Sequence, residues 1–588
     1  MALIDLQVPT SIHIDKFSGS SIAVASAYVK NAIFDKYPDG RVYSMQRPSF
    51  DIFSDASVNS KPAKGRGIHY WNDATYADTY IVNNDTFYRN NYGGISYTLT
   101  GGGGFEKVWM TELGGDLCLA DPENNEFYTF NGSAMTAVGD AQCPVNISGK
   151  TLAHGCVVLD QTLYLLTTDG IIYGSDIANA TSWDALNIIT AEKSEDGGVC
   201  IARHYNSIVV FGNATIEYFY NAANPVGSPL STHVDVSYNI GCVDGNSVAS
   251  NGDMLFFAGL SATGEVGVYM LNDFAPTKIS SPSIDSFLTV ATQIDNAKLI
   301  GSTFGAGGKL FYVLTLYQEV GGVITPDITL VSDLSSQMWA EWEHGSADID
   351  SLPIIGWTTS TTARKGQGIL ANGDAVNVFD DFNPQDTVAG VDIFEPTITI
   401  TGTSDVDFNN ATTNITTTTT DLSQFGVGDT IDVTGTVSNN TSFTITGTPT
   451  ASAIETTVAP TNESSTSATL TREGVFEAGV FSLISQEGDD FEWLLRFPRL
   501  DGGNRNNKLL DEIRIRADQT DNSAEILVKW SDDNHSSFNT GRTIDLNRPE
   551  QKLVSCGKFR SRTIELSYTG DETIRIEGIS AEVRGANK

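Results

Sequence analysis

The sequence predicts an all-β protein: a β-propeller of about six or seven blades, an inserted small Thr-rich β-domain, and a C-terminal region like a β-sandwich. Three observations predict this. Short apolar strands and tight turns recur through most of the chain, a Thr-rich stretch interrupts them, and strands that alternate apolar and charged residues follow. The predicted parts are an N-terminal arm (1–60), the propeller (61–390), the inserted domain (391–475) and the C-terminal β-domain (476–588).

The clearest repeated unit is Leu163–Ser175, LYLLTTDGIIYGS. Two short apolar strands flank Asp169-Gly170, a dipeptide that two-residue hairpin turns favour. We expect Asp169 to belong to a turn and to carry no chemistry.

Similar units occur along residues 65–381, and their starts lie about 40 to 50 residues apart. This period is typical of propeller blades, which bury their faces only against neighbouring blades. No G-H…W-D or clean kelch pattern is present. A stacked pair of β-sandwiches is the alternative. The units are found at 115–138, 156–175, 200–221, 247–271, 299–317 with 328–344, and 354–381.

Residues 1–60 have a mixed pattern that ends in a run of Ser, Asp and Lys residues, and we expect an arm without a core of its own.

The stretch from Pro396 to Thr471 contains no Lys, Arg, His, Cys, Tyr, Trp or Met. A disordered Thr/Ser linker is one interpretation. Regularly placed apolar residues favour a folded all-β module whose threonines lie on exposed faces. These residues are Ile398, Ile400, Ile415, Phe425, Ile431, Val433, Phe443 and Ile445.

The C-terminal region alternates apolar and charged residues, as half-buried antiparallel strands do. Examples are KLLDEIRIRAD, AEILVKWSDD and KFRSRTIELSY. We expect a β-sandwich, one piece of which is available to close the propeller ring.

The net charge is -37, from 35 Lys and Arg against 72 Asp and Glu. Residues 1–390 carry -24, residues 391–475 carry -9 and residues 476–588 carry -4. A surface this acidic repels phosphate, which argues against a protein that binds nucleic acid tightly. It suits solubility, or contact with DNA that must not adhere.

Six cysteines are sparse for 588 residues and form no C-x-x-C pair, so we expect reduced core residues, not a zinc site or disulfide scaffold. They are Cys118, Cys143, Cys156, Cys200, Cys242 and Cys556. No apolar run is long enough to span a membrane, and the first residues lack a signal-peptide pattern. We therefore expect folding in a cytoplasm.

Three pairs of adjacent acidic residues are candidates for catalytic groups. Asp532-Asp533, in WSDDNHSSF, is similar to the Asp-box turn of sialidase-type propellers, but it occurs once, so we expect it to bond its own turn. Asp380-Asp381 and Asp489-Asp490 could supply a glycosidase acid and nucleophile. Adjacent strand residues point to opposite faces, which favours solvated loops for both pairs.

Other motifs also lack the spacing that their chemistry requires. GGGGFE at 101–106 lacks the Lys-Ser/Thr of a phosphate loop. The run from Asp518 to Asp521 lacks the Gly and terminal Glu of a calcium loop. The histidines show no metal or triad spacing: His13, His69, His154, His204, His233, His344 and His535. We predict no catalytic, cofactor-binding or metal site and no enzyme activity. No DNA-channel residue can be assigned.

A resemblance to a known family begins in the C-terminal strands, with Ile526–Asp533, Arg542–Leu546, Lys558–Tyr568 and Ile576–Arg584. These resemble the end of the tail nozzle proteins of short-tailed bacteriophages, also called packaged-DNA stabilisation or tail accessory proteins. Residues near the N-terminus resemble the family more weakly: Asn31, Tyr37-Pro38-Asp39, Arg47–Phe50 and Arg66-Gly67. The chain departs from the family at Ser49 and at Asn534–Ser536, and the Thr-rich module is additional.

The resemblance implies a structural virion protein that forms a ring, usually of six copies, below the portal and its adaptor. Such a ring extends the channel, helps to retain packaged DNA and conducts it during ejection without specific binding. Tail fibres or tailspikes and a needle or plug protein are the implied neighbours. The implied location is the virion tail, assembled in the host bacterial cytoplasm. No cofactor is implied.

Two alternatives remain at this point. A carbohydrate-binding or glycan-cleaving β-propeller at the tail tip is the first, and it would depend on residues such as Asp532. The second is that the Thr-rich module alone binds the host or a fibre.

Overall fold

The fold is described from a computed structural model. It describes residues 2–9, 12, 27–54, 64–73, 75–89, 96–101, 104–191, 193–194, 196–294, 296–320, 323–343, 351–360, 365–370, 375–378, 385–386, 398–418, 422, 425, 430–447, 449–472, 489–501, 506–533, 535, 537–570 and 572–585. The chain divides into two compact units, one of residues 1–389 with 487–588 and the other of residues 390–486.

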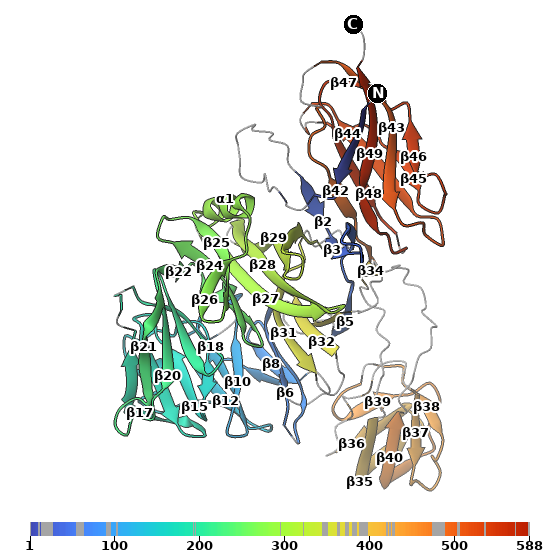
Figure 1. The fold of residues 1–588 in the computed structure, drawn as a ribbon. Coiled ribbons are helices and arrows are strands. Elements are labelled where there is room, and N and C mark those ends of the chain that lie inside the picture. The colour runs from blue at the N-terminus through green and yellow to red at the C-terminus, as the bar shows by residue number, and fades with distance from the viewer. Residues whose placement is uncertain are drawn as a thin grey trace. The chain divides into compact units, whose positions relative to one another are not determined.

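Five antiparallel sheets of consecutive strands form a five-blade arrangement in the first unit (Figure 1). The first three blades are β6 (Gly65–Trp71), β7 (Asp78–Asn83), β8 (Thr86–Arg89) and β9 (Ser96–Thr98); β10 (Trp109–Leu113), β11 (Asp116–Asp121), β12 (Glu126–Phe130) and β13 (Met135–Ala137); and β14 (Val157–Leu159), β15 (Thr162–Leu166), β16 (Ile171–Asp176) and β17 (Asn179–Thr190). The other two are β18 (Gly198–His204), β19 (Ser207–Gly212), β20 (Ile216–Asn221) and β21 (Leu230–Tyr238); and β22 (Ile240–Cys242), β23 (Ala249–Asn251), β24 (Met254–Ser261), β25 (Val266–Asn272) and β26 (Ala275–Lys278).

The hairpin predicted at Leu163–Ser175 is present as β15 and β16. Gly170 has φ of 83°, which a residue with a side chain rarely adopts. Asp169 accepts a hydrogen bond from the Thr167 hydroxyl at 2.5 Å and belongs to the turn, as expected. The short one-turn helix η1 (Pro144–Asn146) connects the second blade to the third, and η2 (Gly245–Ser247) lies within the fifth blade, between β22 and β23.

Two more four-strand sets follow. The first is β27 (Lys298–Ala306), β28 (Lys309–Val320), β29 (Val323–Asp333) and β30 (Met338–Glu341), preceded by helix α1 (Pro282–Ala291). The second is β31 (Ile354–Ser360), β32 (Lys365–Leu370) and β33 (Ala375–Val378), completed by β5 (Phe50–Ser54). Strand β31 packs against both β27 and β6, so these sets lie between the fifth blade and the first. The five-blade arrangement is slightly smaller than the six or seven blades expected.

The N-terminal segment differs from the predicted arm, because its described strands complete sheets elsewhere. These are β1 (Ala2–Gln7), β2 (Tyr28–Lys30), β3 (Ala32–Lys36) and β4 (Val42–Gln46). Strand β1 pairs with the last strand of the chain, and β2 lies between β30 and a C-terminal strand. The strand that completes the β31–β33 sheet is β5, not a C-terminal piece. Only long-range pairing buries the apolar residues of this segment, which local patterns do not reveal.

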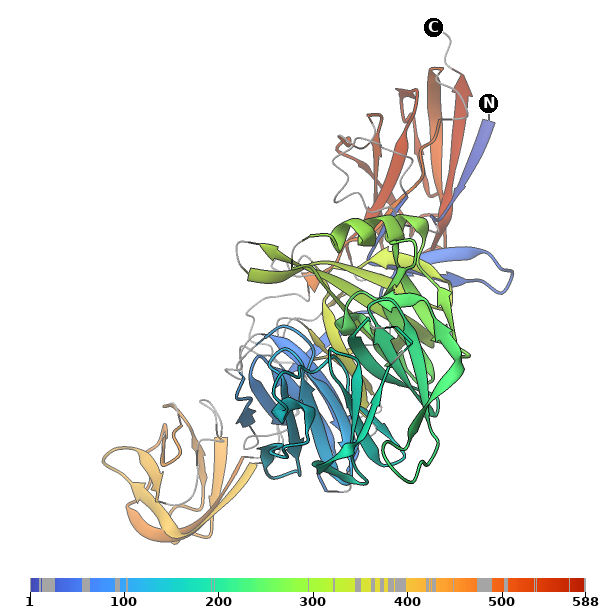
Figure 2. The same ribbon diagram turned by 90° about the vertical axis from the view of Figure 1, so that its left-hand side faces the viewer.

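Two sheets share a core in the C-terminal region, where Figure 2 shows β1 beside the last strands. One continues from β27–β30 and β2 through β42 (Trp493–Arg496), β48 (Thr563–Tyr568), β44 (Glu525–Ser531) and β45 (Arg542–Asp545). The other contains β1, β3 and β4 with β43 (Lys508–Ala517), β46 (Lys552–Val554), β47 (Lys558–Phe559) and β49 (Ile576–Gly585).

The second unit is a six-stranded sheet around its own apolar core. Its strands are β35 (Ile398–Asn409), β36 (Asn414–Thr417), β37 (Thr430–Thr434), β38 (Ser442–Thr444), β39 (Ala453–Glu455) and β40 (Glu463–Arg472). In the first unit, β34 (Gln385–Asp386) pairs with β41 (Asp489–Asp490), which joins the chain on either side of the insertion. Within the described part of the chain, no helix is long and apolar enough to cross a membrane.

The all-β prediction is confirmed.

Candidate functional site

A cluster of five polar residues crosses the middle of the propeller. We call it the axial cluster: Glu106, Lys107, His154, Asn246 and Lys298. Glu106 and Lys107 precede β10, His154 precedes β14, Asn246 lies in η2, and Lys298 begins β27. Each residue therefore lies at or near the first strand of its own sheet, where the chain enters the ring.

Glu106 is the hub of the axial cluster. Its Oε2 atom lies 2.9 Å from the His154 Nε2 atom, and its Oε1 atom accepts a hydrogen bond from the Lys298 ammonium at 2.7 Å. Burial opposes ionisation of Glu106, but the bonds from His154 and Lys298 outweigh it and lower the pKa of this carboxyl to about 2. Burial likewise disfavours a charged Lys298, yet Glu106 raises the pKa of that amine.

Lys107 is buried and reaches farther across the ring. Its amine donates to the carbonyl oxygen of Val248 at 3.2 Å and to that of Gly301, and it lies 5.0 Å from the centre of the Trp109 ring. Burial lowers the pKa of Lys107 to about 8. Its backbone N–H donates to the Asn246 side chain at 3.0 Å.

These bonds connect sheets that are not neighbours. Lys107, from the second blade, reaches the fifth blade at Val248 and the β27 sheet at Gly301. The Asn246 amide of the fifth blade lies 3.1 Å from His154 of the third. Side chains can make such bonds only across the centre of the ring, so the axial cluster occupies the propeller axis.

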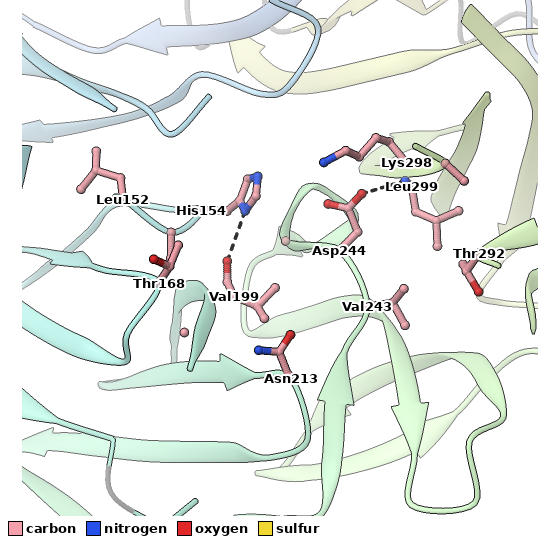
Figure 3. Close-up of a pocket in the computed structure, with 14 residues that line it drawn as sticks. Leu152, His154, Thr168, Val199, Asn213, Val243, Asp244, Thr292, Lys298 and Leu299 are labelled. Atoms are coloured by element: carbon pink, nitrogen blue, oxygen red, sulfur yellow. Dashed lines mark hydrogen bonds between the residues drawn. The ribbon is translucent and has the colours of Figure 1, made fainter. Parts of the chain in front are cut away.

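A cavity of about 400 Å³ opens beside the axial cluster (Figure 3). His154, Asp244 and Lys298 line it, together with Thr168 and Asn213. The Asp244 carboxylate accepts the backbone N–H of Leu299 at 2.9 Å, and the His154 Nδ1 atom lies 3.2 Å from the Val199 carbonyl oxygen. The polar groups that line this cavity form hydrogen bonds between neighbouring sheets, and their role in the fold is structural.

A buried ion pair adjoins the axial cluster. The Arg66 guanidinium donates two bonds to the Asp121 carboxylate, at 2.9 and 2.6 Å, and both side chains are 0% exposed. Its Nε atom donates to the Glu106 carbonyl oxygen at 2.9 Å. Arg66, one of the residues that carry the family resemblance, therefore fixes the first blade to the second.

A second buried hub contains Asn31 and Arg47, which also carry the resemblance. The Asn31 Oδ1 atom accepts bonds from Arg47 at 3.1 Å and from the Glu343 backbone at 2.8 Å. The Asn31 amide donates to the Glu492 carbonyl oxygen at 3.1 Å, and the Arg47 guanidinium lies 3.8 Å from the centre of the Phe491 ring. This hub joins the N-terminal segment, the propeller and the C-terminal region.

Asp532 and Asp533 bond structural partners. The Asp532 carboxylate accepts two bonds from the buried Arg562 guanidinium, both at 2.7 Å. Asp533 accepts the Ser537 hydroxyl at 2.5 Å and its backbone N–H at 2.9 Å. The Ser537 hydroxyl is the largest of several hydrogen-bonding effects that lower the pKa of Asp533 to about 2. Asp533 bonds its own turn as expected, whereas Asp532 holds a neighbouring strand.

The other acidic pairs are not brought into a common site by the described contacts. Asp489 and Asp490 form β41, where they pair with Asp386 and Gln385. They are therefore in a short strand pair and not in the solvated loop that we expected, while Asp380-Asp381 lies outside the described residues. Asp518 forms an ion pair with Arg575, with 3.6 Å between the charged groups.

The histidines are scattered over the fold, except that His154 joins the axial cluster. His69 lies 3.0 Å from Glu112, His204 lies 3.1 Å from Tyr218, and His535 lies 3.0 Å from Thr563. The His233 ring packs against Tyr220, while His13 and His344 lie outside the described residues. Where side chains are described, no group of three or more His, Cys, Asp and Glu residues could hold a metal ion.

The remaining sequence candidates have structural surroundings. In GGGGFE, the backbone N–H groups of Phe105 and Glu106 both donate to the Glu123 carboxylate at 3.0 Å, while Gly102 and Gly103 lie outside the described residues. All six cysteines are free thiols, and five are buried, Cys156 being intermediate. Burial raises the pKa of Cys156 to about 12, as it does for Cys143 and Cys242.

Sequence reasoning missed the axial cluster, because its members are 192 residues apart at the extremes and share no motif. A weak signal was available: a charged or polar residue precedes the first strand of several units, at the position that faces the ring centre.

Comparison with solved structures gives similarities at low identity. BamB from Moraxella catarrhalis is 10% identical with a TM-score of 0.31, covering 64% of this chain and 97% of that chain. A chain of the Mitotic Checkpoint Complex is 10% identical with a TM-score of 0.27, covering 53% of this chain and 88% of that chain. Scores this low carry no argument about function. A search of curated proteins finds no match to this chain.

A family model described as "Bacteriophage P22 Gp10, beta-propeller" matches residues 46–349, more than half of the chain. The matched region begins next to Arg47 and includes the five blades and the axial cluster. This match confirms the resemblance to phage packaged-DNA stabilisation proteins that the sequence motifs indicated. The chain therefore belongs to the bacteriophage P22 Gp10 β-propeller family and is a structural protein of a phage tail.

Proposed function

We propose that this protein is a tail nozzle: a ring of copies, usually six in this kind of protein, that extends the portal-adaptor channel. In this role it helps to retain packaged DNA and conducts it during ejection. The observation that carries the proposal is the family match over residues 46–349.

The charge supports a conduit that does not bind DNA. Each copy carries -37, and a wall of the same sign as phosphate gives few adhesive contacts with a passing duplex. An acidic outer surface would give the same total charge, so this observation supports the proposal without carrying it.

The axial cluster supports a DNA path that lies outside the propeller. Glu106, Lys107 and Lys298 bridge the middle of the propeller, and the adjoining cavity of about 400 Å³ is far too small for a duplex. The propeller therefore acts as a solid wall element, and the channel of the nozzle lies between copies of the chain.

We further propose that β27–β30, and β31–β33 with β5, serve as a sixth and a seventh blade. Each is a four-stranded antiparallel set, and β31 packs against β27 on one side and β6 on the other. The seventh blade then combines strands from two distant parts of the chain, because β5 pairs with β33.

The partners in this proposal are further copies of the chain, the portal-adaptor ring, tail fibres or tailspikes, and a needle or plug protein. Viral DNA passes through the lumen without specific binding. Assembly takes place in the host cytoplasm, which suits six free and mostly buried thiols. No catalytic role is included. The glycan-cleaving alternative relied on Asp532, and the salt bridge to Arg562 gives that residue a structural role instead.

The test combines images of the purified protein with a phage that lacks it. The proposal predicts rings with a central opening, and particles without the protein that fail to keep their DNA. Strictly monomeric protein together with DNA-filled, stable particles would overturn it.

A further inference from the structure

The outer edges of the third and fourth blades expose most of the large apolar side chains that the first unit leaves in solvent. In the described residues of that unit, nine such side chains are exposed, and six of them lie within residues 177–234. They are Ile177, Leu186, Ile188, Tyr220, Val226 and Val234. Soluble proteins rarely gather exposed apolar residues in this way without a partner.

The strands that form these edges are unusually long. The outermost strand β17 has 12 residues and β21 has 9, whereas β9 and β13 have 3 and β26 has 4. A long exposed edge offers unpaired backbone groups to another chain, which natural proteins usually avoid by keeping edges short or charged.

Both edges also carry the same irregularity. In β17, the six residues from Trp183 to Ile188 lie opposite only three residues of β16, from Tyr173 to Ser175. In β21, the six residues from Thr232 to Ser237 lie opposite only three residues of β20, from Glu217 to Phe219.

Each of these two bulges adds three residues to its outer strand, and β17 has a second shift where its partner passes from Ser175 to Asp176. A bulge is a built feature of a sheet. Leu186 lies in one bulge and Val234 in the other, and they are 64% and 87% exposed. The outer strands β9, β13 and β26 pair without such a shift. Among the described outer strands of the five blades, such three-residue bulges are therefore found in β17 and β21 alone, and the outer strand β5 has a shift of one residue.

The loop before β21 extends the same surface toward β17. A side chain placed on Gly227 would lie 3.7 Å from the Leu186 carbonyl oxygen, so the loop that carries Val226 lies next to the β17 bulge. The Asn224 amide fixes this loop through bonds to the Ser228 and Leu230 carbonyl oxygens, at 3.1 and 3.0 Å. We call the surface formed by residues 177–190, 220–226 and 232–237 the bulged edge.

The bulged edge contains acidic residues and no Lys or Arg. Residues 151–192 and 204–277 contain no Lys or Arg, while Asp184 and Asp235 lie in the edge strands β17 and β21 and Asp176 ends the neighbouring strand β16. The Lys193 amine donates a hydrogen bond to Ser237 at one end of the surface.

The C-terminal region has the exposed cations that the bulged edge lacks, among acidic residues that bring the net charge of residues 476–588 to -4. Seven exposed cations lie within residues 506–585: Arg514, Arg542, Arg548, Lys558, Arg560, Arg575 and Arg584. The sheet that contains Arg514 and Arg584 also exposes Leu3 and Val554, at 69% and 50%. A ring requires two different faces on each subunit, and the cation-bearing C-terminal region is the part of the chain that we pair with the bulged edge.

We propose that the bulged edge is the surface on which a second copy of this chain docks. This inference rests on the proposed ring, because a ring needs a lateral contact between copies. Apolar side chains at the two bulges supply the buried centre of the contact, and the acidic residues around them select a cation-bearing face.

The test compares two double variants of the full chain. Leu186→Asp with Val234→Asp places charges at the centre of the bulged edge. Val437→Asp with Val458→Asp is the matched control, because both valines are exposed, at 90% and 63%, but lie in the second unit. Light scattering coupled to size-exclusion chromatography measures self-association. We expect the dissociation constant to rise about a hundredfold for the first pair and to stay unchanged for the control.

The outcomes separate the docking surface from the ring itself. If the wild type forms rings and the Leu186/Val234 variant, with an unchanged unfolding midpoint, forms them equally well, the docking surface is wrong and the ring stands. If the wild type forms no ring either in solution or in isolated tails, the proposed function is wrong as well.

A photo-reactive amino acid in place of Leu186 identifies the occupant in assembled tails. A cross-link between two copies of this chain supports the proposal. A cross-link only to a different tail protein overturns it.

Discussion

The contacts that stabilise the first compact unit internally differ in kind from those inside the second. In the first unit, buried cations join segments that are far apart in sequence, as Arg47 does between the N-terminal segment and Phe491. In the second unit, strands drawn from 75 consecutive residues surround one small apolar core. Charged hubs therefore mark the places where remote parts of the chain meet.

Hydroxyl, amide and carboxylate groups supply the described polar contacts of the second unit. Thr401 lies 3.2 Å from Thr469 across two strands, and Thr430 lies 3.4 Å from Thr444. The Glu463 carboxylate accepts the backbone N–H groups of Val437 and Ser438 at 2.8 and 3.1 Å. Such a unit needs no help from distant residues, so the two units are expected to respond separately to mutation. All eight tryptophans lie outside residues 390–486, and tryptophan fluorescence therefore reports on the first unit alone.

The largest effect is expected for Arg66→Ala. This change leaves the Asp121 carboxylate buried without its cation, which costs about 3 to 5 kcal/mol. Urea unfolding followed by tryptophan fluorescence measures the loss. Arg41→Ala is the control, because the Arg41 side chain is exposed and solvent screens its ion pairs. Equal effects of the two substitutions would show that the buried ion pair of Arg66 and Asp121 is not needed for stability.

The next effect should be confined to the second unit. Ile431→Ala removes a fully buried side chain from its core and is expected to cost about 2 to 4 kcal/mol. Thermolysin should then cleave within residues 398–472 more rapidly, while the tryptophan signal stays unchanged. Val437→Ala, at an exposed position, should alter neither. A shift in the tryptophan transition would contradict the independence of the two units.

Lys107→Met tests the axial cluster through pH. The Lys107 amine has a pKa of about 8 when folded and about 10.4 in an unfolded chain, so the unfolded state binds more protons between these values. Stability should therefore rise with pH in this window, by about 3 kcal/mol in all. The rise should be missing in Lys107→Met and retained in the exposed control Lys36→Met. The same pH dependence in all three proteins would place Lys107 outside the buried axis.

The smallest effect is expected when residues 390–486 are replaced by a short Gly/Ser linker. Pairing of Gln385 with Asp490 and of Asp386 with Asp489 already brings the two flanking segments together. Because loop-closure entropy changes slowly with length, the first unit should change by less than about 1 kcal/mol. Tryptophan-detected unfolding measures this. Failure of the shortened chain to fold would show that the second unit supports the first.

Local patterns explain which features could be predicted from the sequence. The hairpin at Leu163–Ser175 and the apolar set around Ile431 follow from strand alternation and turn residues, and both are found in the structure. The pairing of β1 with β49 and the placement of β5 beside β33 have no local signal, since each depends on contacts hundreds of residues apart.

The axial cluster was missed for a related reason. Glu106 resembles any surface acid in the sequence, and its role appears only when the blades bring His154 and Lys298 to it. The bulges of β17 and β21 could not be predicted from the sequence either, because extra residues in a strand do not change its composition in a recognisable way.

The most direct test of this account is a cryo-electron microscopy map of DNA-filled phage tails. We expect density for several copies of this chain around a central channel, DNA density on the axis between the copies, and a closed centre in every propeller. DNA density running through the middle of a propeller, or the absence of this chain from the tail, would contradict the account.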